Sequence, residues 1–305
     1  MNKPLIALGH ELDTGPEAFG ELLPCNDLEG NAPALNERLA QDGYLFLRDF
    51  LDIDQVMSAR QEILSRISER GGLRPETPLM DGISIEGPEG QVFSHDLARD
   101  NQALEAVLYS GLLRDFFELL LGGAIGHFDY TWFRAYAGGQ QGTYPHCDRV
   151  YMGRGTPDLY TAWVPFGDVP LELGGLMILE GSHLLETERM RDYLESDVDK
   201  YCLDDENAAD IVSGKIYLKW DGSLTDNPGE LRAELGGRWL TTDYRAGDLV
   251  VFTMATVHGS LDNQSDRFRL SSDSRYQLAG EPVDERWMGE NPSAHGPESK
   301  IGMIC

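Results

Sequence analysis

The sequence predicts a mainly β protein with flanking helices, built as a sandwich or jelly roll rather than around a parallel sheet. Two observations favour this class. The two clear helical patterns lie before residue 122, and short strands separated by turn signals follow from residue 127 onward. A third observation concerns size: with 305 residues, 41% of them hydrophobic and 25% charged, the chain can form a sizeable core.

The N-terminal part begins with an arm and continues into a strand and a helix. Residues 1–33 are rich in Gly, Pro, Asp and Glu, which predicts an irregular arm. Residues 43–50 are aromatic and aliphatic after a glycine, as in a short strand. Asp52 is expected to cap the next helix, with Gln55 as its capping-box partner. One face of that helix is expected to pack inward through three apolar residues at helical spacing: Val56, Ile63 and Ile67.

A loop and a second helix follow. Residues 71–91 contain repeated glycines and prolines, which indicates a loop. From Asn101 to Leu121 the apolar residues are so dense that we expect one largely buried helix. Gly122 and Gly123 are placed to end it, because glycine readily takes the left-handed conformation found after helix C-termini.

The strands of the predicted core are short and aromatic or aliphatic, with glycine-containing turns between several of them. We expect them at His127–Tyr136, Leu159–Phe166, Leu176–Leu179, Leu249–Phe252 and Arg267–Leu278.

One long segment interrupts these strands. Residues 184–237 are rich in charge, and loops of such length are usually functional or disordered. We interpret them as an insertion with a partial helix at Leu185–Leu194, placed over one end of the barrel as part of the substrate mouth. The whole chain is expected to form one domain, with an N-terminal strand and helices (34–126), a core (127–279) that contains the insertion, and a C-terminal tail on the surface (280–305).

Charge and composition exclude some partners. With 52 acidic and 25 basic residues the net charge is −27, which repels nucleic acid and anionic membranes. The N-terminus has no signal-peptide pattern, and no run approaches the roughly 20 apolar residues of a membrane helix, so we expect a cytoplasmic protein. The cysteines contain no C-x-x-C pair and predict neither a disulfide framework nor a zinc ribbon: Cys25, Cys147, Cys202 and Cys305.

A candidate metal site starts at His146-Cys147-Asp148. In a strand, residues two apart point to the same side, so His146 and Asp148 are expected to project together while Cys147 packs behind them. His258, which follows the strand at 249–252, is the best third ligand. Two histidines and one carboxylate leave three coordination positions open, an arrangement that suits ferrous iron.

The H-x-D triplet alone is a weak signal, because a strand histidine bonded to a nearby carboxylate gives the same letters. The residues after His258 strengthen it. Gly259 and Ser260 follow directly, and then come Asn263, Ser265 and, eleven residues beyond the histidine, Arg269.

With these motifs the chain resembles the phytanoyl-CoA dioxygenase family of iron and 2-oxoglutarate oxygenases, from Asp42 to about Tyr276. The resemblance rests on several motifs in matching order. They are the opening strand 42–50, His146-Cys147-Asp148, Ala162-Trp163, Gly174-Gly175-Leu176, Gly181-Ser182-His183, and His258-Gly259-Ser260 with Asn263, Ser265 and Arg269.

The resemblance implies a double-stranded β-helix (a cupin-like jelly roll) that binds Fe(II), O2 and 2-oxoglutarate. It implies that Arg269 and Ser260 bind the distal carboxylate of 2-oxoglutarate, which agrees with the rigid fork of donors that arginine offers to a carboxylate. Arg267 is the rival on the same strand face. Trp163 either lines the 2-oxoglutarate pocket or is a core tryptophan.

The implied reaction is hydroxylation or desaturation of a small organic substrate, with release of succinate and CO2. Halogenases of the family lack the carboxylate ligand, so Asp148 argues against halogenation. The negative charge argues against acyl-CoA substrates unless a local basic patch overrides it, and we favour a free small molecule. The residues of such a patch would be Arg134, Arg149 and Arg154.

The remaining histidines have no partners at ligand spacing, and we assign them no metal role: His10, His95, His127, His183 and His295. Two other functions stay open. A cupin-like metalloenzyme independent of 2-oxoglutarate would have Arg269 far from the metal, and a non-catalytic jelly-roll binding protein would hold no divalent metal. The sequence does not indicate an oligomeric state.

Overall fold

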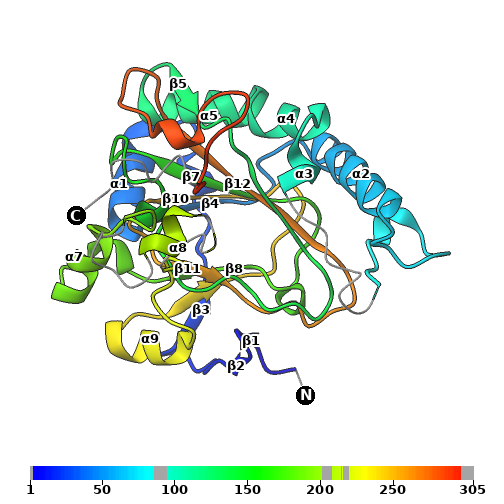
Figure 1. Cartoon of the computed structure of the whole chain (residues 1–305), viewed down its shortest axis with the longest axis horizontal. Coiled ribbons are helices and arrows are strands. Elements are labelled where there is room, and N and C mark those ends of the chain that lie inside the picture. Colours follow the sequence, from blue (N-terminus) through cyan, green and yellow to red (C-terminus); the bar gives the residue numbers. More distant parts are fainter. Residues whose placement is uncertain (1–2, 86–94, 201–207, 214, 216–219, 297–305) are drawn as a thin grey trace.

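The computed structural model describes residues 3–85, 95–200, 208–213, 215 and 220–296, and it consists of two facing sheets with helices around them (Figure 1). Among these residues the larger sheet has six strands and the smaller has four. This is the predicted jelly-roll architecture, mainly β with flanking helices. The division of the chain into one domain with the bounds given above stays a prediction.

The strand orders place chain segments distant in sequence side by side. The larger sheet runs β4 (Tyr44–Leu47), β10 (Leu249–Thr253), β7 (Tyr160–Pro165), β12 (Arg269–Leu278) and β5 (Ile125–His127), and β6 (Trp132–Tyr136) also pairs with β12. The smaller sheet runs β11 (His258–Ser260), β8 (Leu176–Leu179), β9 (Trp239–Thr241) and β3 (Phe19–Glu21). A separate hairpin joins β1 (Ile6–Ala7) to β2 (His10–Glu11).

Most helices lie outside the two sheets. Their bounds are α1 (Ala32–Asp42), α2 (Ile53–Glu69), α3 (His95–Ala98), α4 (Gln102–Leu108), α5 (Gly111–Leu121), α6 (Arg149–Met152), α7 (Glu188–Leu194), α8 (Ala208–Val212) and α9 (Pro228–Leu235). Short 3-10 turns lie at Asn26–Leu28, Leu79–Asp81, Leu171–Leu173, Ser182–Leu184 and Glu285–Trp287.

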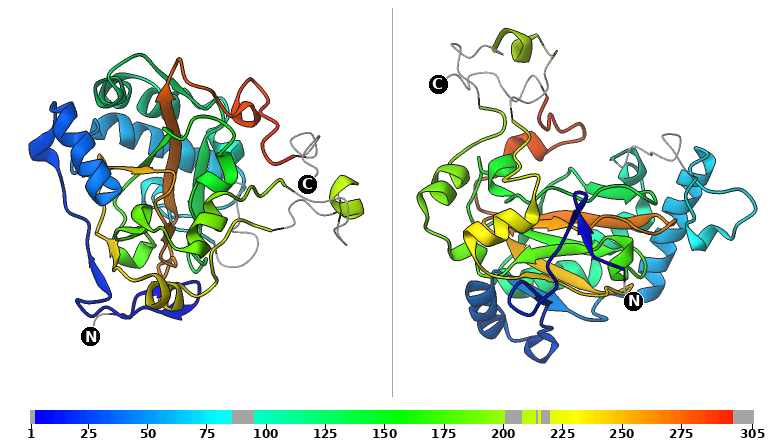
Figure 2. Two further views of the ribbon diagram at one scale, coloured as in Figure 1. Left: turned by 90° about the vertical axis from the view of Figure 1, so that its left-hand side faces the viewer. Right: turned by 90° about the horizontal axis from the view of Figure 1, so that it is seen from below.

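Strand β4 of the larger sheet is apolar on both faces, because both of its faces are covered. Along β4 the side chains alternate, so Phe46 joins the cluster between the sheets, while Leu45 and Leu47 join the cluster under the helices. Ile63 of α2 and Phe117 of α5 belong to that second cluster. Helices α2, α4 and α5 therefore cover the outer face, as Figures 1 and 2 show.

Several polar residues of strand β12 face the space between the two sheets. Its Asp273 lies opposite Trp163 of β7, and Arg275 lies opposite Thr161. Trp163 packs in the cluster between the sheets. Because side chains alternate along a strand, the odd-numbered residues of β12 from Arg269 to Arg275 share this inner face.

Several predicted bounds were wrong. The single helix expected at 101–121 is broken into α4 and α5, since Ser110 is extended and Gly111 has a φ of 55°. The strand expected at 127–136 is two strands, β5 and β6, which pair with successive parts of β12. The predicted helix cap is confirmed. Asp52 accepts a hydrogen bond from the backbone N–H of Gln55 at the start of α2.

The N-terminal arm is more regular than its composition predicted. β3 adds to the edge of the smaller sheet through backbone pairing with β9, which needs little from the side chains. Helix α1 was missed although its signals are present: Asn31 accepts from the N–H of Ala34, and Gly43 ends the helix with a φ of 77°. No helix of the described residues is both long and apolar enough to cross a membrane.

We predict that Gly43→Ala destabilises the fold more than Gly122→Ala. Both glycines follow a helix with a left-handed φ, so each substitution should lower the free energy of unfolding by about 1 kcal/mol. A Cβ at Gly43 would also overlap the imidazole of His183, whereas nothing lies near a Cβ at Gly122. We expect a further loss of about 1–3 kcal/mol in urea unfolding for Gly43→Ala alone.

The control is His183→Ala combined with each glycine variant. The extra loss at Gly43 should disappear in this background, because the imidazole is its cause. If both glycine variants lowered the free energy of unfolding equally in the native background, the overlap with His183 would have no effect on stability.

Candidate metal centre

Two histidines from distant segments are joined through their backbones. The N–H of His146 donates to the carbonyl of His258, and the N–H of His258 donates to the carbonyl of His146, both at 2.9 Å. In such a reciprocal antiparallel pair the two side chains emerge next to each other. Their rings lie with centroids 4.2 Å apart.

The hydrogen bonds of both rings select one tautomer. Nδ1 of His146 lies 2.7 Å from the carbonyl oxygen of Tyr144, and Nδ1 of His258 lies 3.0 Å from that of Thr256. A carbonyl only accepts, so each Nδ1 carries the proton and each Nε2 offers a lone pair. Burial, together with the neighbouring His258, lowers the pKa of His146 to about 3, and burial also lowers the pKa of His258. Both rings are therefore neutral near pH 7, as metal ligands must be.

Asp148 completes the group, but not through a strand. Only His146 makes a β bridge. Asp148 has helical backbone angles and begins α6, because the N–H groups of Tyr151 and Met152 bond back to its carbonyl. The strand predicted across 146–148 was therefore wrong. Asp148 Oδ1 nevertheless lies 3.9 Å from Nε2 of His146 and 3.8 Å from Nε2 of His258.

The Asp148 carboxylate is held ionised and in place by two donors. Thr161 Oγ1 donates to Oδ2 at 2.5 Å, and Nη2 of Arg275 donates to Oδ1 at 3.1 Å. Burial alone would raise the pKa of Asp148, but the charge of Arg275, with the hydrogen bond from Thr161, holds that pKa well below its usual range. Donors behind a ligand carboxylate fix its orientation toward a metal.

The donor set fits ferrous iron. One ligand atom from each of His146, Asp148 and His258 lies within 4.8 Å of the others, and within the described ranges this is the one such group of His, Cys, Asp or Glu. All three residues are buried. Two neutral imidazoles and one carboxylate with open positions are the donors that non-haem iron oxygenases use.

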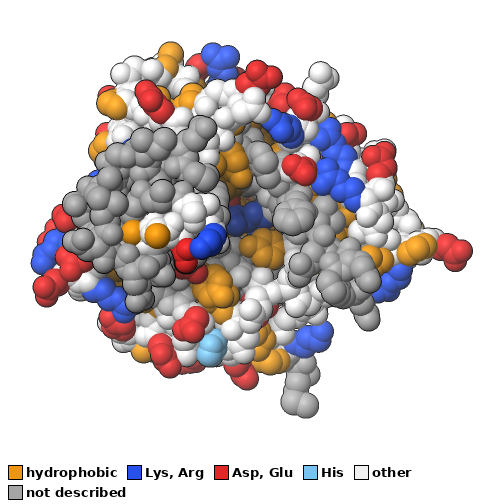
Figure 3. Space-filling view, in the orientation of Figure 1, with side chains coloured by type: hydrophobic (Ala, Val, Ile, Leu, Met, Phe, Trp, Pro, Cys, Tyr) orange, Lys and Arg blue, Asp and Glu red, His pale blue; other side chains and the backbone are white. Residues whose placement is uncertain are grey.

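A cavity of about 270 Å³ opens beside this group. Its walls come from β6, from α6 and the stretch before it, from the insertion, from β12 and from the C-terminal tail. The lining residues are Trp132, Arg134, Thr143, Tyr144, His146, Asp148, Tyr151, Met152, Asp221, Ser223, Arg275 and His295. Figure 3 shows a hollow near the centre of one face, with Lys or Arg and hydrophobic side chains inside it.

Arg269 is buried without an acidic partner. Its side chain is 2% exposed, its guanidinium lies 4.2 Å over the ring of Tyr136, and Nη1 donates to Ser271 Oγ at 2.9 Å. Nη2 has no hydrogen-bond partner in the described structure, and burial lowers the pKa of Arg269 to about 10. The rival Arg267 is exposed. Of the two arginines, only Arg269 is thus a buried cation that lacks an anion.

A short chain of contacts connects Arg269 to the metal cavity. The hydroxyl of Tyr136, under Arg269, lies 2.9 Å from Thr143 Oγ1, and Thr143 lines the cavity. The N–H of Thr143 donates to Ser260 Oγ at 2.8 Å, which leaves the hydroxyl proton of Ser260 for another acceptor. Trp163, by contrast, lies in the inner core with its ring 4.6 Å from that of Tyr244, and it is not among the residues that line this cavity.

Several residues of the site were missed in the sequence. Arg275 shares the face of Arg269 six residues along the same strand, and this even spacing was a signal that could have identified it. Thr161 lies opposite Arg275 on β7 and had no signal of its own. His295, given no role, lines the cavity, and its Nδ1 lies 3.0 Å from Asp199 Oδ2.

The basic patch proposed from sequence does not form. Only Arg134 of the three arginines lines the cavity, and its Nε donates to Asp273 Oδ2 at 2.6 Å. Arg149 donates to the carbonyl of Leu194, and Arg154 pairs with Asp197 at 2.7 Å. These two arginines hold the insertion, because their partners belong to it.

The insertion reaches the cavity at Asp221 and Ser223, and it is tied to the metal-site loop. The hydroxyl of Tyr193 accepts from the N–H of Cys147 at 3.0 Å and donates to the carbonyl of Gly222 at 2.6 Å. Cys147 is fully buried behind this loop, and burial raises the pKa of its thiol well above the usual value.

The C-terminal tail also covers the cavity, and it does more than lie on the surface as predicted. Arg286 donates to Asp199 of the insertion at 2.6 Å, and Trp287 is buried beneath it. The insertion and the tail are therefore held together over the cavity by ion pairs.

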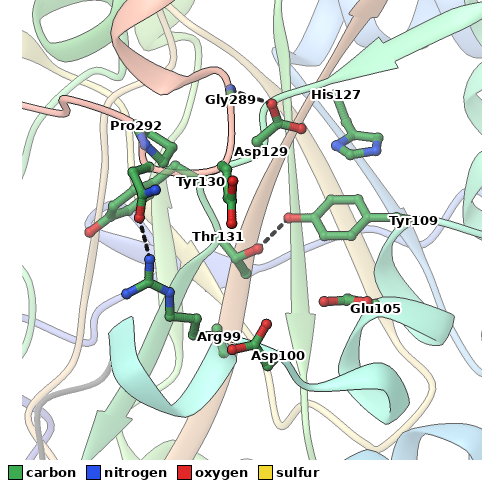
Figure 4. A pocket seen from close by; sticks show the side chains of 13 residues that line it. Arg99, Asp100, Glu105, Tyr109, His127, Asp129, Tyr130, Thr131, Gly289 and Pro292 are labelled. Atoms are coloured by element: carbon green, nitrogen blue, oxygen red, sulfur yellow. Dashed lines mark hydrogen bonds between the residues drawn. The ribbon is translucent and has the colours of Figure 1, made fainter.

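A second, larger cavity of about 880 Å³ does not fit this chemistry (Figure 4). It is lined by Asp100, Glu105 and Asp129, with Arg99 turned toward the tail, where it donates to Asn291. These carboxylates would repel a dicarboxylate, and they form no ligand group of the kind found at the metal centre. The smaller cavity is the candidate site.

Comparisons with known proteins agree with this chemistry. A family model described as phytanoyl-CoA dioxygenase (PhyH) matches residues 39–271. The 1-deoxypentalenic acid 11-beta-hydroxylase of Streptomyces exfoliatus is 26% identical over 276 residues, which are 86% of this chain and 87% of that protein. The enzyme of the same name from Streptomyces arenae is 27% identical over the same length.

Solved structures share the fold. The epimerase SnoN, in complex with Fe3+, alpha ketoglutarate and nogalamycin RO, has a TM-score of 0.53 and 22% identity, covering 85% of this chain and 93% of its own. EctD from S. alaskensis, with 2-oxoglutarate and 5-hydroxyectoine, has a TM-score of 0.56 and 17% identity, covering 96% and 89%.

We predict that the affinity for Mn²⁺ changes by less than about 10-fold between pH values of about 7.5 and 5.5. Two imidazoles with ordinary pKa values near 6.5 would be mostly protonated at the lower pH, and binding would weaken by roughly 100-fold. The pKa of about 3 for His146 keeps that ring neutral over this range, and the lowered pKa of His258 reduces the competition of protons at the second ring. Competition titration against a chelator, corrected for its own protonation, should therefore show a change below about 10-fold. A change near 100-fold would show that the pKa values of the two imidazoles are not lowered.

Proposed function

The chain belongs to the phytanoyl-CoA dioxygenase family of non-haem iron, 2-oxoglutarate-dependent oxygenases, and we propose that it holds its iron with His146, Asp148 and His258 to hydroxylate a small organic substrate. The observation that carries the assignment of ligands is the convergence of these three buried donors beside a cavity. When bound, iron and 2-oxoglutarate supply the oxidising chemistry that consumes O2 and releases succinate and CO2.

The residues of the chain provide a fixed and dry environment. The two histidines present neutral Nε2 atoms, and Thr161 with Arg275 holds the Asp148 carboxylate toward them. The insertion and the tail are held over the cavity and restrict the entry of water. These roles need no movement of the ligands, since the β bridge between the histidines sets their positions.

We propose that Arg269 binds the distal carboxylate of 2-oxoglutarate, with the Ser260 hydroxyl as a second donor. Two features support this. A 2% exposed guanidinium without an acidic partner is costly to keep in a protein, and a ligand carboxylate would satisfy its free Nη2. Tyr136 and Thr143 also connect Arg269 to the metal cavity, which disfavours a cupin-like enzyme that works without 2-oxoglutarate. A role of Trp163 in this pocket gains no support from its contacts.

The type of reaction and the class of substrate are proposed from the residues of the site and from the relatives. With Asp148 as a ligand, the iron would lack the position at which the halogenases of the family hold a halide, which favours hydroxylation over halogenation. The relatives named as 11-beta-hydroxylases favour hydroxylation over desaturation. A free small molecule fits the size of the cavity. A cytoplasmic location and the lack of nucleic-acid partners remain proposals from composition.

We predict that Arg269→Ala weakens 2-oxoglutarate binding by roughly 30- to 700-fold, as expected when one partner of a buried charge pair worth about 2–4 kcal/mol is removed. The measurement is a titration of 2-oxoglutarate against the iron-loaded protein under argon, followed by visible absorption. Metal affinity should be nearly unchanged. Arg267→Ala is the matched control because that arginine is exposed on the same segment, and a larger effect there would move the clamp to Arg267.

We also predict that the insertion controls coupling of the reaction. Asp199→Ala, which removes the contacts of the insertion with Arg286 and His295 of the tail, should raise the ratio of succinate to hydroxylated product severalfold, because water gains access. Tyr193→Phe is a milder variant that removes the contacts with Cys147 and Gly222, and it should shift the ratio in the same direction. Normal coupling and selectivity in both folded variants would show that the insertion is a surface feature only.

A further inference from the structure

Arg275 is a second buried cation in the wall of the metal cavity. It is 2% exposed, its guanidinium lies 4.6 Å over the ring of Trp132, and its Nε donates to the sulfur of Met152 at 3.2 Å. Nη2 donates to Asp148 Oδ1 at 3.1 Å. Nη1 has no hydrogen-bond partner among the described residues.

The charges around Arg275 are not balanced once a metal is bound. Asp273, whose charge also interacts with Arg275, already accepts a hydrogen bond from Arg134 at 2.6 Å, so two arginines share this one carboxylate. Asp148 Oδ1 faces both histidines, and it is the oxygen that a metal would take. A divalent ion there would also be neutralised by the Asp148 carboxylate, so this carboxylate would balance less of the charge of Arg275. The loaded site thus holds a buried guanidinium with an unused donor and a weakened counter-ion.

A carboxylate is the ligand that fits this guanidinium. The guanidinium keeps its charge near neutral pH, and a carboxylate accepts a charge-assisted hydrogen bond from its unused Nη1. A cationic substrate would meet both Arg275 and the metal, and a neutral one would leave the charge of Arg275 unmatched.

The rest of the cavity wall is mixed, and four of its residues offer apolar surface to the body of such an acid beside the polar Asp221 and Ser223. Trp132, Tyr144, Tyr151 and Met152 contribute rings and a thioether to its walls. A volume of about 270 Å³ lies just under the roughly 300–1,000 Å³ of pockets for drug-sized ligands. The hollow in Figure 3 shows the same combination of basic and hydrophobic side chains.

We propose that the substrate is a small, mainly apolar carboxylic acid whose carboxylate binds Nη1 of Arg275 beside Asp148. This inference rests on the proposed function and names the substrate class of the same site. Each of the two buried arginines then binds one carboxylate. Arg269 binds that of the co-substrate, and Arg275 binds that of the substrate. Because Arg275 contacts the ligand Asp148, the anchored acid has its nearby carbons next to the metal.

The test compares acids with their amides. Protein loaded with Mn²⁺ and saturated with 2-oxoglutarate under argon is titrated by calorimetry with cyclohexanecarboxylate, phenylacetate and octanoate, and with the three corresponding amides. Saturation with 2-oxoglutarate keeps the probes away from Arg269. We expect at least one acid to bind roughly 10- to 100-fold more tightly than its amide, the range for a hydrogen bond to a charged group.

Three variants assign the preference to Arg275. Arg275→Gln should remove it, and Arg275→Lys should weaken acid binding severalfold while amide binding stays the same, because the charge remains but the planar guanidinium that directs Nη1 is lost. Arg267→Gln, an exposed position of the same segment, should bind acids as the native protein does. If Arg275→Gln fails to hold Mn²⁺, the Arg275→Lys variant decides, and unchanged acid binding there overturns the proposal.

Binding of Mn²⁺ and of 2-oxoglutarate is measured in the same samples. A native protein that binds neither contradicts the proposed function itself. A native protein that binds both, yet shows no preference for any acid over its amide, overturns only the assignment of the substrate class. A preference that persists in Arg275→Gln also overturns it, since Arg275 would then act only in positioning Asp148.

Discussion

The site depends on one pair of backbone hydrogen bonds, those exchanged between His146 and His258. They join a loop after β6 to the start of β11, more than a hundred residues later in the chain. Because both bonds are made by the backbone, they set the positions of the two imidazoles before any metal binds. The carbonyls of Tyr144 and Thr256 then set the tautomer of each ring, so ligand geometry and protonation both follow from the main chain.

The backbone bridge does not hold Asp148, and the larger sheet provides the donors that do. β7 brings Thr161 and β12 brings Arg275 to opposite oxygens of Asp148, since these two residues are paired across the strands. A buried carboxylate would otherwise tend to take up a proton. The inner face of β12 is unusually polar for a core strand, and this is consistent with a wall that faces ligands more than it faces the opposite sheet.

The end of the barrel is closed by segments that carry little regular structure. Asp199 of the insertion receives both Arg286 and His295 of the tail, and Tyr193 connects α7 to the loop of Cys147. These contacts are polar and lie at the mouth of the cavity, and the one from Tyr193 reaches the backbone between His146 and Asp148. Loops over a rigid scaffold commonly carry the contacts that select a substrate.

The sequence by itself determined the fold class, most strands and the identity of the candidate ligands, because alternation, turn residues and motif order are local or ordered along the chain. It did not determine that Asp148 begins a helix, since the histidine bridge that ends the extended segment is a long-range contact. Nor did it place Arg275 or His295 at the cavity. Their roles come from strand pairing and from ion pairs with the insertion, and such tertiary contacts bring together residues whose separation along the chain carries no pattern.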